Sequence, residues 1–217
     1  MTRNELISAI WRGRDPFEGF PANLYRQDLQ GWRSQHGLLS RSIEETKPHV
    51  IVEVGAWKGA SSLFMARTLK QLEIPGTVIA VDTWLGSSDH WESDKWFAEL
   101  CYEGGFPSLW KKFYANVIES GLRDYVVPLP LDSIGAAHYL KKIGIRPEMI
   151  HIDAGHDFRS VYTDLEEWWT LLADGGVLVG DDYEPSWPGV CEAFDKFSTE
   201  KGLTLEVDTG KCRIKKN

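Results

Sequence analysis

The chain has 217 residues, of which 42% are hydrophobic and 26% charged, as in an ordinary globular protein. This length suits one domain with a sizeable core, so we expect residues 1–217 to form a single domain. The formal net charge of −8 argues against nucleic acid as the main partner, because phosphate contacts need clustered Lys and Arg. The only basic cluster is Lys211–Lys216, which we expect to be solvated.

The sequence also argues against a secreted or membrane protein. It has 3 cysteines and no C-x-x-C pair, a sparse set typical of a reduced, cytoplasmic protein. The polar start Met1–Glu5 does not resemble a signal peptide. No segment offers the roughly 18 uninterrupted apolar residues of a membrane span, so we expect no membrane partner.

Strands and helices are predicted to alternate after an irregular, partly helical region at residues 1–49. Short apolar runs predict buried strands at 49–54, 77–81, 125–129, 148–152 and 176–180. Helical spacing of apolar residues predicts helices at 58–72, 93–102, 107–119, 133–143, 158–172 and around 190–197. Asp132 and Asp157 are expected N-caps. Residues 203–208 and 211–215 are predicted to form a closing hairpin.

This alternation predicts an α/β, Rossmann-like, doubly wound fold. Its mostly parallel seven-stranded sheet has helices on both faces and a C-terminal antiparallel hairpin. Ligands of such sheets bind beyond the carboxyl ends of the strands. Four predicted strands end in acidic residues, which we expect to converge on one crevice: Glu53, Asp82, Asp153, Asp181 and Asp182.

The first strand-to-helix turn carries Gly55 and Gly59 in G-x-x-x-G spacing. Dinucleotide sites use G-x-G-x-x-G to seat a pyrophosphate on a helix N-terminus, whereas S-adenosylmethionine (SAM) has no phosphate to seat. The glycine pair alone is equally typical of a plain tight turn. Asp82 ends the second strand, where a carboxylate can accept hydrogen bonds from both ribose hydroxyls of SAM or NAD. A solvated Asp that begins a loop is the alternative interpretation.

Three segments together resemble the class I SAM-dependent methyltransferases: IVEVGAWKGASS, VIAVDTWLGS and MIHIDAGHDFRSVYTDLEEWWTLLADGGVLVGDDY. The narrower resemblance, from Val50 to Phe197, is to the metal-dependent natural-product and sugar O-methyltransferases. That subfamily includes macrolide-sugar and cephalosporin-hydroxylase-like members. The resemblance implies a cofactor site with three parts. The methionyl group would lie against Glu53, Gly55, Trp57 and Ser61, and the ribose against Asp82, Thr83 and Trp84. The adenine would lie against Asp132 and Ser133.

The same resemblance implies that Asp153, Asp181 and Asp182 hold a divalent cation. We expect this cation to be Mg²⁺, because Mg²⁺ prefers oxygen ligands such as carboxylates. Such a cation lowers the pKa of an acceptor hydroxyl. The alternative is that Asp181 and Asp182 are ordinary loop acids. Many of these relatives have Asp-Gly-Asp where this chain has Asp153-Ala154-Gly155-His156. His156 is therefore the candidate general base beside Asp153, or else it holds the loop by bonding a carboxylate.

Residues 83–120, the Trp-rich insert, are longer than an ordinary strand-to-helix loop and are expected to act as a lid. Most of its aromatics are expected to pack in extra helices, with Trp91 the best candidate for a substrate contact. Residues 1–49 are expected to form a helical cap on the same site or to make a homo-oligomer contact.

These features favour a SAM-dependent, Mg²⁺-assisted O-methyltransferase of a small hydroxylated metabolite, either a sugar or another natural product. An NAD-dependent oxidoreductase is the first alternative. The G-x-x-x-G turn and the lack of a Tyr-x-x-x-Lys pair around Tyr139 argue against it. The second alternative is a non-catalytic SAM-fold module that binds a partner through the Trp-rich insert.

Overall fold

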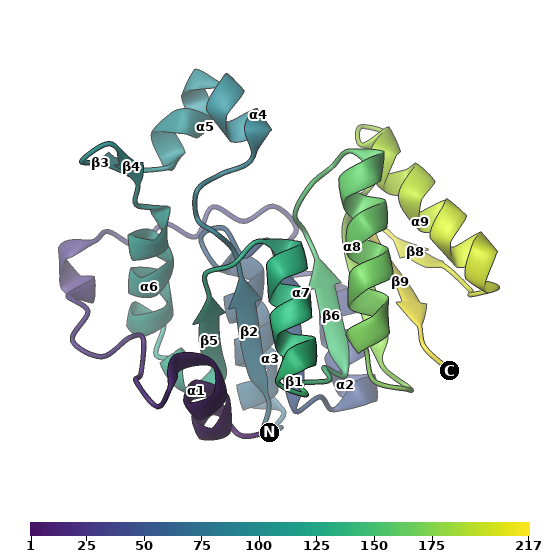
Figure 1. Cartoon of the computed structure of the whole chain (residues 1–217), viewed down its shortest axis with the longest axis horizontal. Coiled ribbons are helices and arrows are strands. Elements are labelled where there is room, and N and C mark those ends of the chain that lie inside the picture. Colours follow the sequence, from purple (N-terminus) through teal and green to yellow (C-terminus); the bar gives the residue numbers. More distant parts are fainter.

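A computed structural model describes residues 1–217 (Figure 1). The α-helices are α1 Arg3–Trp11, α2 Gly37–Thr46, α3 Ala60–Gln71, α4 Ser88–Glu92, α5 Asp94–Glu99, α6 Leu109–Glu119, α7 Ser133–Lys142, α8 Phe158–Leu171 and α9 Pro188–Lys201. The strands are β1 Val50–Val54, β2 Thr77–Val81, β3 Tyr102–Glu103, β4 Phe106–Pro107, β5 Val126–Leu129, β6 Met149–Ile152, β7 Val177–Tyr183, β8 Glu206–Asp208 and β9 Gly210–Lys215. Two short 3₁₀ turns lie at Ala22–Leu24 and Arg123–Tyr125.

Seven strands form one sheet in the order β5-β2-β1-β6-β7-β9-β8. The pairs from β5 to β7 are parallel, and β9 pairs antiparallel with both β7 and β8. This is the predicted fold class, with the closing hairpin at one edge of the sheet. The strand order reverses between β1 and β6, and such a switch point opens a crevice at the carboxyl ends of the strands.

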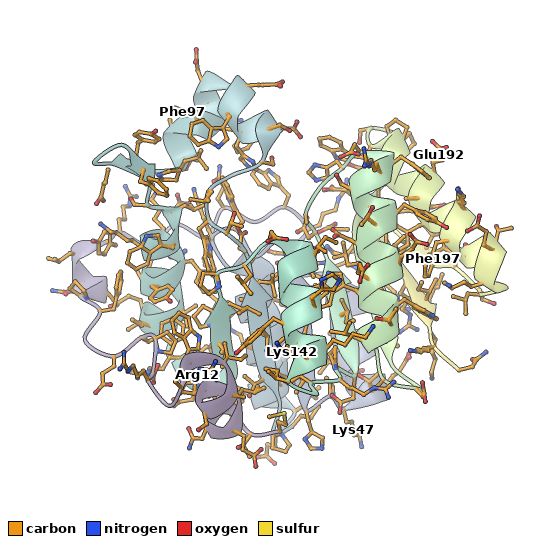
Figure 2. The ribbon with its side chains drawn as sticks, in the orientation of Figure 1. Arg12, Lys47, Phe97, Lys142, Glu192 and Phe197 are labelled. Carbon is orange, nitrogen blue, oxygen red and sulfur yellow. The ribbon has the colours of Figure 1, made fainter.

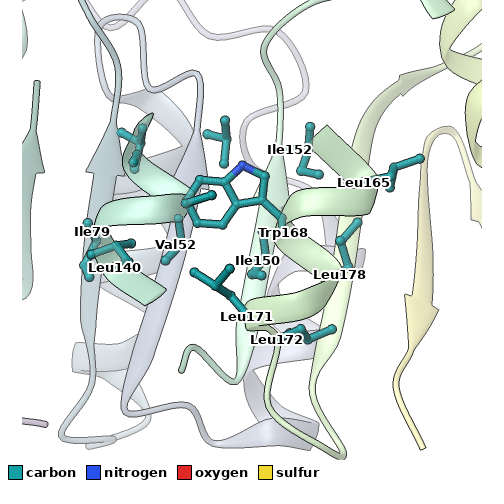
Figure 3. Close-up of a cluster of buried hydrophobic side chains, with 14 of the residues drawn as sticks. Val52, Ile79, Leu140, Ile150, Ile152, Leu165, Trp168, Leu171, Leu172 and Leu178 are labelled. Carbon is teal, nitrogen blue, oxygen red and sulfur yellow. The ribbon is translucent and has the colours of Figure 1, made fainter. Parts of the chain in front are cut away.

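Helices cover both faces of the sheet because its parallel strands are apolar on both sides. In β1, Val52 and Val54 face a core shared with α1, α7, α8 and α9, whereas Ile51 faces a core shared with α2, α3 and α6. Figure 1 shows α7 and α8 in front of the sheet and α2 and α3 behind it. Figure 3 shows the indole of Trp168 among apolar side chains of the first core.

The expected helix caps are confirmed, since Asp132 accepts from the backbone N–H of Gly135 and Asp157 from that of Ser160. The helix expected at 93–102 is present as α5, but it is shorter than predicted and spans only Asp94–Glu99. The short helix α4 precedes it, and the separate β3–β4 hairpin follows it. In Figure 2, Phe97 of α5 lies beyond the carboxyl ends of the strands. No helix combines the length and apolar character that a membrane crossing requires.

The β7 strand extends past its predicted end at residue 180. The register with β9 shifts between Gly180 and Tyr183, which forms a β-bulge, and Asp182 has a left-handed φ of 55°. A bulge leaves one residue unpaired and redirects the side chains around it. The sequence prediction missed this because Asp is uncommon inside strands, so Asp181 and Asp182 indicated a strand end.

Candidate active site

The loops after β1 and β6 touch at the floor of the crevice. Gly55 has a φ of 89°, and a Cβ atom there would lie 1.8 Å from the carbonyl oxygen of Asp153. Glycine is therefore the residue that permits this approach. The contact brings the G-x-x-x-G turn next to Asp153, as expected for residues at the carboxyl ends of parallel strands.

Asp82 holds the turn together from the end of β2. One carboxylate oxygen accepts from the backbone N–H of Trp57 at 2.7 Å, and the other accepts from that of Trp84 at 2.7 Å. Burial raises the pKa of Asp82, and these hydrogen bonds oppose the shift. Each oxygen keeps a lone pair for a further donor. Asp82 is therefore placed to shape the turn and to receive a ligand hydroxyl.

Trp57 and Trp84 differ in what they offer a ligand. The Trp57 ring is half-buried and stacks on His90 of α4, with ring centroids 4.4 Å apart. Its Nε1 is a buried polar atom without a hydrogen-bond partner. The Trp84 indole is only 2% exposed and donates to the Trp57 carbonyl oxygen at 2.8 Å. Thr83, the other predicted flanking residue, is exposed.

Glu53 lies wholly inside the sheet. Its carboxylate accepts from the hydroxyl of Ser62 and lies 3.1 Å from Nδ1 of His151, its neighbour on β6. Ser61, which the resemblance assigned to the methionyl side, is buried at the start of α3. Glu53 therefore ties β1 to the first turn of α3 through Ser62 and to β6 through His151.

Lys211 continues this buried polar row, which sequence reasoning missed. It is fully buried, and its Nζ donates to Asp181 and lies 3.4 Å from Nε2 of His151. The expectation that the whole Lys211–Lys216 cluster is solvated is thus wrong for Lys211. No local sequence pattern marks this residue, because its burial depends on the pairing of β9 with β7.

The acidic residues form two overlapping groups with Asp153 in common. Ligand atoms lie within 4.8 Å of one another in His151, Asp153 and Asp181, and likewise in Asp153, His156 and Asp182. Burial and the negative charge of Asp181 raise the pKa of Asp153 well above its usual value. Burial also pushes the pKa of Asp181 upward, but the charges of Lys211 and His151 and the hydrogen bonds to its carboxylate together lower that pKa below its usual value.

His156 lies at the open side of the second group. Its Nε2 is 3.1 Å from a carboxylate oxygen of Asp182, and its ring stacks on Trp187 with centroids 4.1 Å apart. Its Nδ1 is 4.0 Å from a carboxylate oxygen of Asp89, which belongs to α4. The ring is thus oriented by three neighbours and fits both predicted roles, general base and loop support. A small pocket of about 210 Å³, partly open to solvent, lies beside His156, Asp153 and Asp182.

The predicted adenine residues lie at the carboxyl end of β5. Asp132 is exposed while it caps α7. Ser133 donates to Asp164 at 2.5 Å and accepts from Nε1 of Trp168 at 2.8 Å, so its hydroxyl joins α7 to α8. Only Asp132 therefore has a side chain free to face a ligand.

The Trp-rich insert lies over the crevice through α4, whose His90 contacts Trp57 and whose Asp89 approaches His156. Trp91 is 48% exposed, but its ring packs edge-on against Phe97 and its indole nitrogen donates to the Leu85 carbonyl oxygen. Trp91 therefore belongs to a small cluster within the insert, and His90 is the residue that faces the turn.

The fold and the placement of the crevice define a Rossmann-like α/β protein of the methyltransferase type. The chain belongs to a family described as a methyltransferase domain, whose model matches residues 52–183. The matched range contains the G-x-x-x-G turn, Asp82 and all three of the clustered aspartates. The resemblance to the methyltransferases that was inferred from the sequence is confirmed.

Solved structures share the fold at low sequence identity. The O-methyltransferase NovP has a TM-score of 0.64 and 20% identity over 85% of this chain and 80% of its own. An O-methyltransferase of Bacillus cereus in complex with SAH has a TM-score of 0.60 and 18% identity, over 98% of this chain and 96% of its own. A third structure is TomG of Streptomyces achromogenes, an O-methyltransferase involved in tomaymycin synthesis, in complex with SAM. It has a TM-score of 0.59 and 16% identity, over 99% of this chain and 96% of its own. No curated protein matches this chain.

Proposed function

We propose that the protein is a SAM-dependent O-methyltransferase that acts on a small hydroxylated metabolite with the help of a divalent cation. The observation that carries this proposal is the meeting of the Gly55 turn with Asp153 at the switch point, in a chain of the methyltransferase family. The meeting puts the candidate cofactor turn next to a cluster of carboxylates, and cation-assisted methyl transfer to a hydroxyl uses both.

For the cofactor, we propose that Asp82 binds the ribose hydroxyls and that Gly55 and Trp57 border the methionyl part. The unpartnered Nε1 of Trp57 supports this assignment, because a buried donor without an acceptor is costly unless a ligand supplies one. Asp132 would border the adenine. The structures of TomG with SAM and of the Bacillus cereus enzyme with SAH support the choice of cofactor.

The residues of the acidic cluster fit a divalent cation. Asp153 has a half-buried carboxylate close to the negative charges of Asp181 and Asp182, which the charge of Lys211 offsets only in part. Asp153 and Asp182 would hold the cation, with Asp181 contributing where Lys211 leaves it a free oxygen. When bound, the cation would lower the pKa of the acceptor hydroxyl.

His156 would receive the proton of the acceptor hydroxyl. We assign its Nε2 as the nitrogen that donates to Asp182, which leaves Nδ1 free to accept. The imidazolium that forms would lie between Asp182 and Asp89, and both carboxylates would stabilise its charge. Trp187 stacks on one face of the ring and would hold its orientation during the proton transfer.

Binding of S-adenosylhomocysteine (SAH), measured by titration calorimetry, tests the cofactor. We expect a 1:1 isotherm for the wild type and at least a tenfold weaker Kd for Asp82→Ala, since about 1.4 kcal/mol of hydrogen bonding corresponds to tenfold. Asp208→Ala, at an exposed ion pair far from the turn, is the control. No heat with SAH, or an equal affinity for NAD, would contradict the proposal.

Titration of Mn²⁺ followed by electron paramagnetic resonance tests the cation without reference to catalysis. Asp182→Asn is expected to weaken Mn²⁺ binding at least tenfold, because it removes a charged oxygen ligand. Asp195→Asn removes an acid of α9 that bonds Tyr183 and serves as the control. Equal Mn²⁺ affinity in the wild type and Asp182→Asn would reject the cation site.

A further inference from the structure

Lys58 lies in the middle of the cofactor turn, and the proposed function gives it no part. Its side chain is fully buried. Its Nζ has three oxygen partners: Asp28 at 2.6 Å, Gln30 at 2.5 Å and Glu99 at 2.6 Å. A buried ammonium needs such partners because it has no water to replace them. One side chain of the turn therefore connects two segments that are far away in the sequence.

Asp28 and Gln30 belong to residues 28–36, here called the strap, which precede α2. Asp28 exchanges backbone hydrogen bonds with the Asn116 side chain of α6, at 3.1 Å and 2.9 Å. Gly31 passes so close to α3 that a Cβ on it would lie 2.4 Å from that of Ala60. Further along the strap, Arg33 bonds Glu184 after β7 at 2.6 Å. The strap thus runs along the carboxyl ends of the strands from α6 to β7.

Glu99 ends α5 of the Trp-rich insert, the second cover of the crevice. The insert and the strap also touch each other directly, because Trp32 packs edge-on against Trp96 of α5 with ring centroids 5.3 Å apart. On its inner side the insert rests on the turn itself through His90 and Trp57. The turn, the strap and the insert therefore meet around the single ammonium of Lys58.

We propose that Lys58 is a positioning residue that couples ligand binding at the turn to the strap and to α5. A ligand that orders the backbone of the turn also fixes Nζ, and Nζ holds both covers through charged hydrogen bonds. This inference rests on the proposed function, because it takes SAH as the ligand of the turn. It also gives the residues before β1 a role in covering the site.

Hydrogen–deuterium exchange with and without SAH tests the coupling. In the wild type we expect SAH to slow exchange several-fold at 26–33 and at 94–100. In Lys58→Met the same saturating SAH should still protect the turn and α3 but leave those two segments unprotected. Lys111→Met removes an ion pair within the insert, to Glu103, and should keep the wild-type response. Unchanged protection of both segments in Lys58→Met would overturn the proposal.

Two further variants each weaken one connection of Lys58 and keep the ammonium. Glu99→Gln should weaken protection of 94–100 alone, and Asp28→Asn, which also loses the ion pair with Lys112, should weaken protection of 26–33 alone. They also test the coupling if Lys58→Met fails to fold, and loss of protection in neither segment would count against it. If the wild type binds SAH and neither segment responds, the inference fails and the proposed function stands. If the wild type gives no heat with SAH, the proposed function itself fails.

Discussion

Lys211 and Asp181 place opposite charges inside the sheet, where neither is solvated. The attraction between two such charges offsets their desolvation only when both are present. His151 and Glu53 extend the pair into a polar row across β9, β7, β6 and β1. The row fixes the carboxylate of Asp181 at the edge of the crevice, and the ion pair of Lys211 is made with Asp181 rather than with Asp153.

Replacing Lys211 with Met should lower the free energy of unfolding by about 3–5 kcal/mol, since it leaves the Asp181 carboxylate buried without a counter-charge. Urea denaturation at neutral pH measures the change. Lys215→Met, on the same strand but exposed, should change stability by less than about 0.5 kcal/mol.

The double variant Lys211→Met with Asp181→Asn separates the ion pair from simple packing. Because both charges are gone, it should recover part of the stability that the single variant lost. A double variant that is less stable than the sum of the two single changes would contradict the pairing.

For individual residues, the sequence predicted where side chains converge but not which hydrogen bonds and ion pairs they form. Asp82, Asp153 and the two aspartates of β7 were predicted from the rule that parallel strands end at one edge. Lys211 was missed because Lys is seldom buried and because nothing local reveals that its strand lies beside β7. The partners of Ser133 and Trp84 also depend on tertiary packing.

The turn after β1 and the bulge in β7 show how single elements shape the site. In a regular strand, consecutive side chains point to opposite faces, so Asp181 and Asp182 would separate. The bulge lets Asp181 face Lys211 while Asp182 reaches His156. The strand positions were predictable from apolar runs, whereas the bulge was not, because it depends on the register with β9.

Gly55→Ala should disrupt the turn more than an ordinary substitution at a left-handed glycine. Alanine pays about 1–2 kcal/mol for the positive φ, and its Cβ would also overlap the carbonyl group of Asp153. We expect a loss of more than about 2 kcal/mol in the free energy of unfolding, together with weaker SAH binding.

Gly144→Ala is the matched control, because Gly144 also has a positive φ, of 75°, but has open space around it. It should lose about 1 kcal/mol and bind SAH normally. Equal losses in the two variants would mean that the contact between the two loops is not what demands glycine at position 55.

The free energy of unfolding of the whole molecule depends on pH, and the buried carboxyl of Asp164 contributes to this dependence. Burial raises the pKa of Asp164, between α7 and α8, from 3.8 to about 6, although the hydrogen bond from Ser133 opposes the shift. An acid whose pKa is higher in the folded than in the unfolded protein lowers the free energy of unfolding as the pH rises. The effect is absent below about 4, grows between 4 and 6, and is complete above 6.

Asp164→Asn should therefore be more stable than the wild type at pH 7, by up to about 3 kcal/mol, and the two should converge toward pH 4. Asparagine keeps an oxygen for the Ser133 hydroxyl, so packing is preserved. Urea denaturation across this pH range measures the difference. A gap between the two proteins that does not change with pH would contradict the assignment.

The overall fold was the most predictable property. The alternation of apolar runs and helical spacing determined the sheet, its hairpin and the helix faces, because burial on both sides leaves a strong signal. The short elements of the Trp-rich insert were less predictable, since α4, α5 and the β3–β4 hairpin are each too brief to show a period. No local sequence pattern predicts the path of the strap across the ends of the strands.

The position of Lys211 also has a consequence for how the protein is made. The acids of the crevice belong to strands synthesised early, from β1 to β7, whereas the ammonium that pairs with Asp181 belongs to β9, the last strand of the sheet to leave the ribosome. A nascent chain that lacks β9 would have to bury Asp181 without its partner. The centre of the sheet is therefore expected to become stably folded only when β9 pairs with β7, which makes this pairing a late step of folding during synthesis.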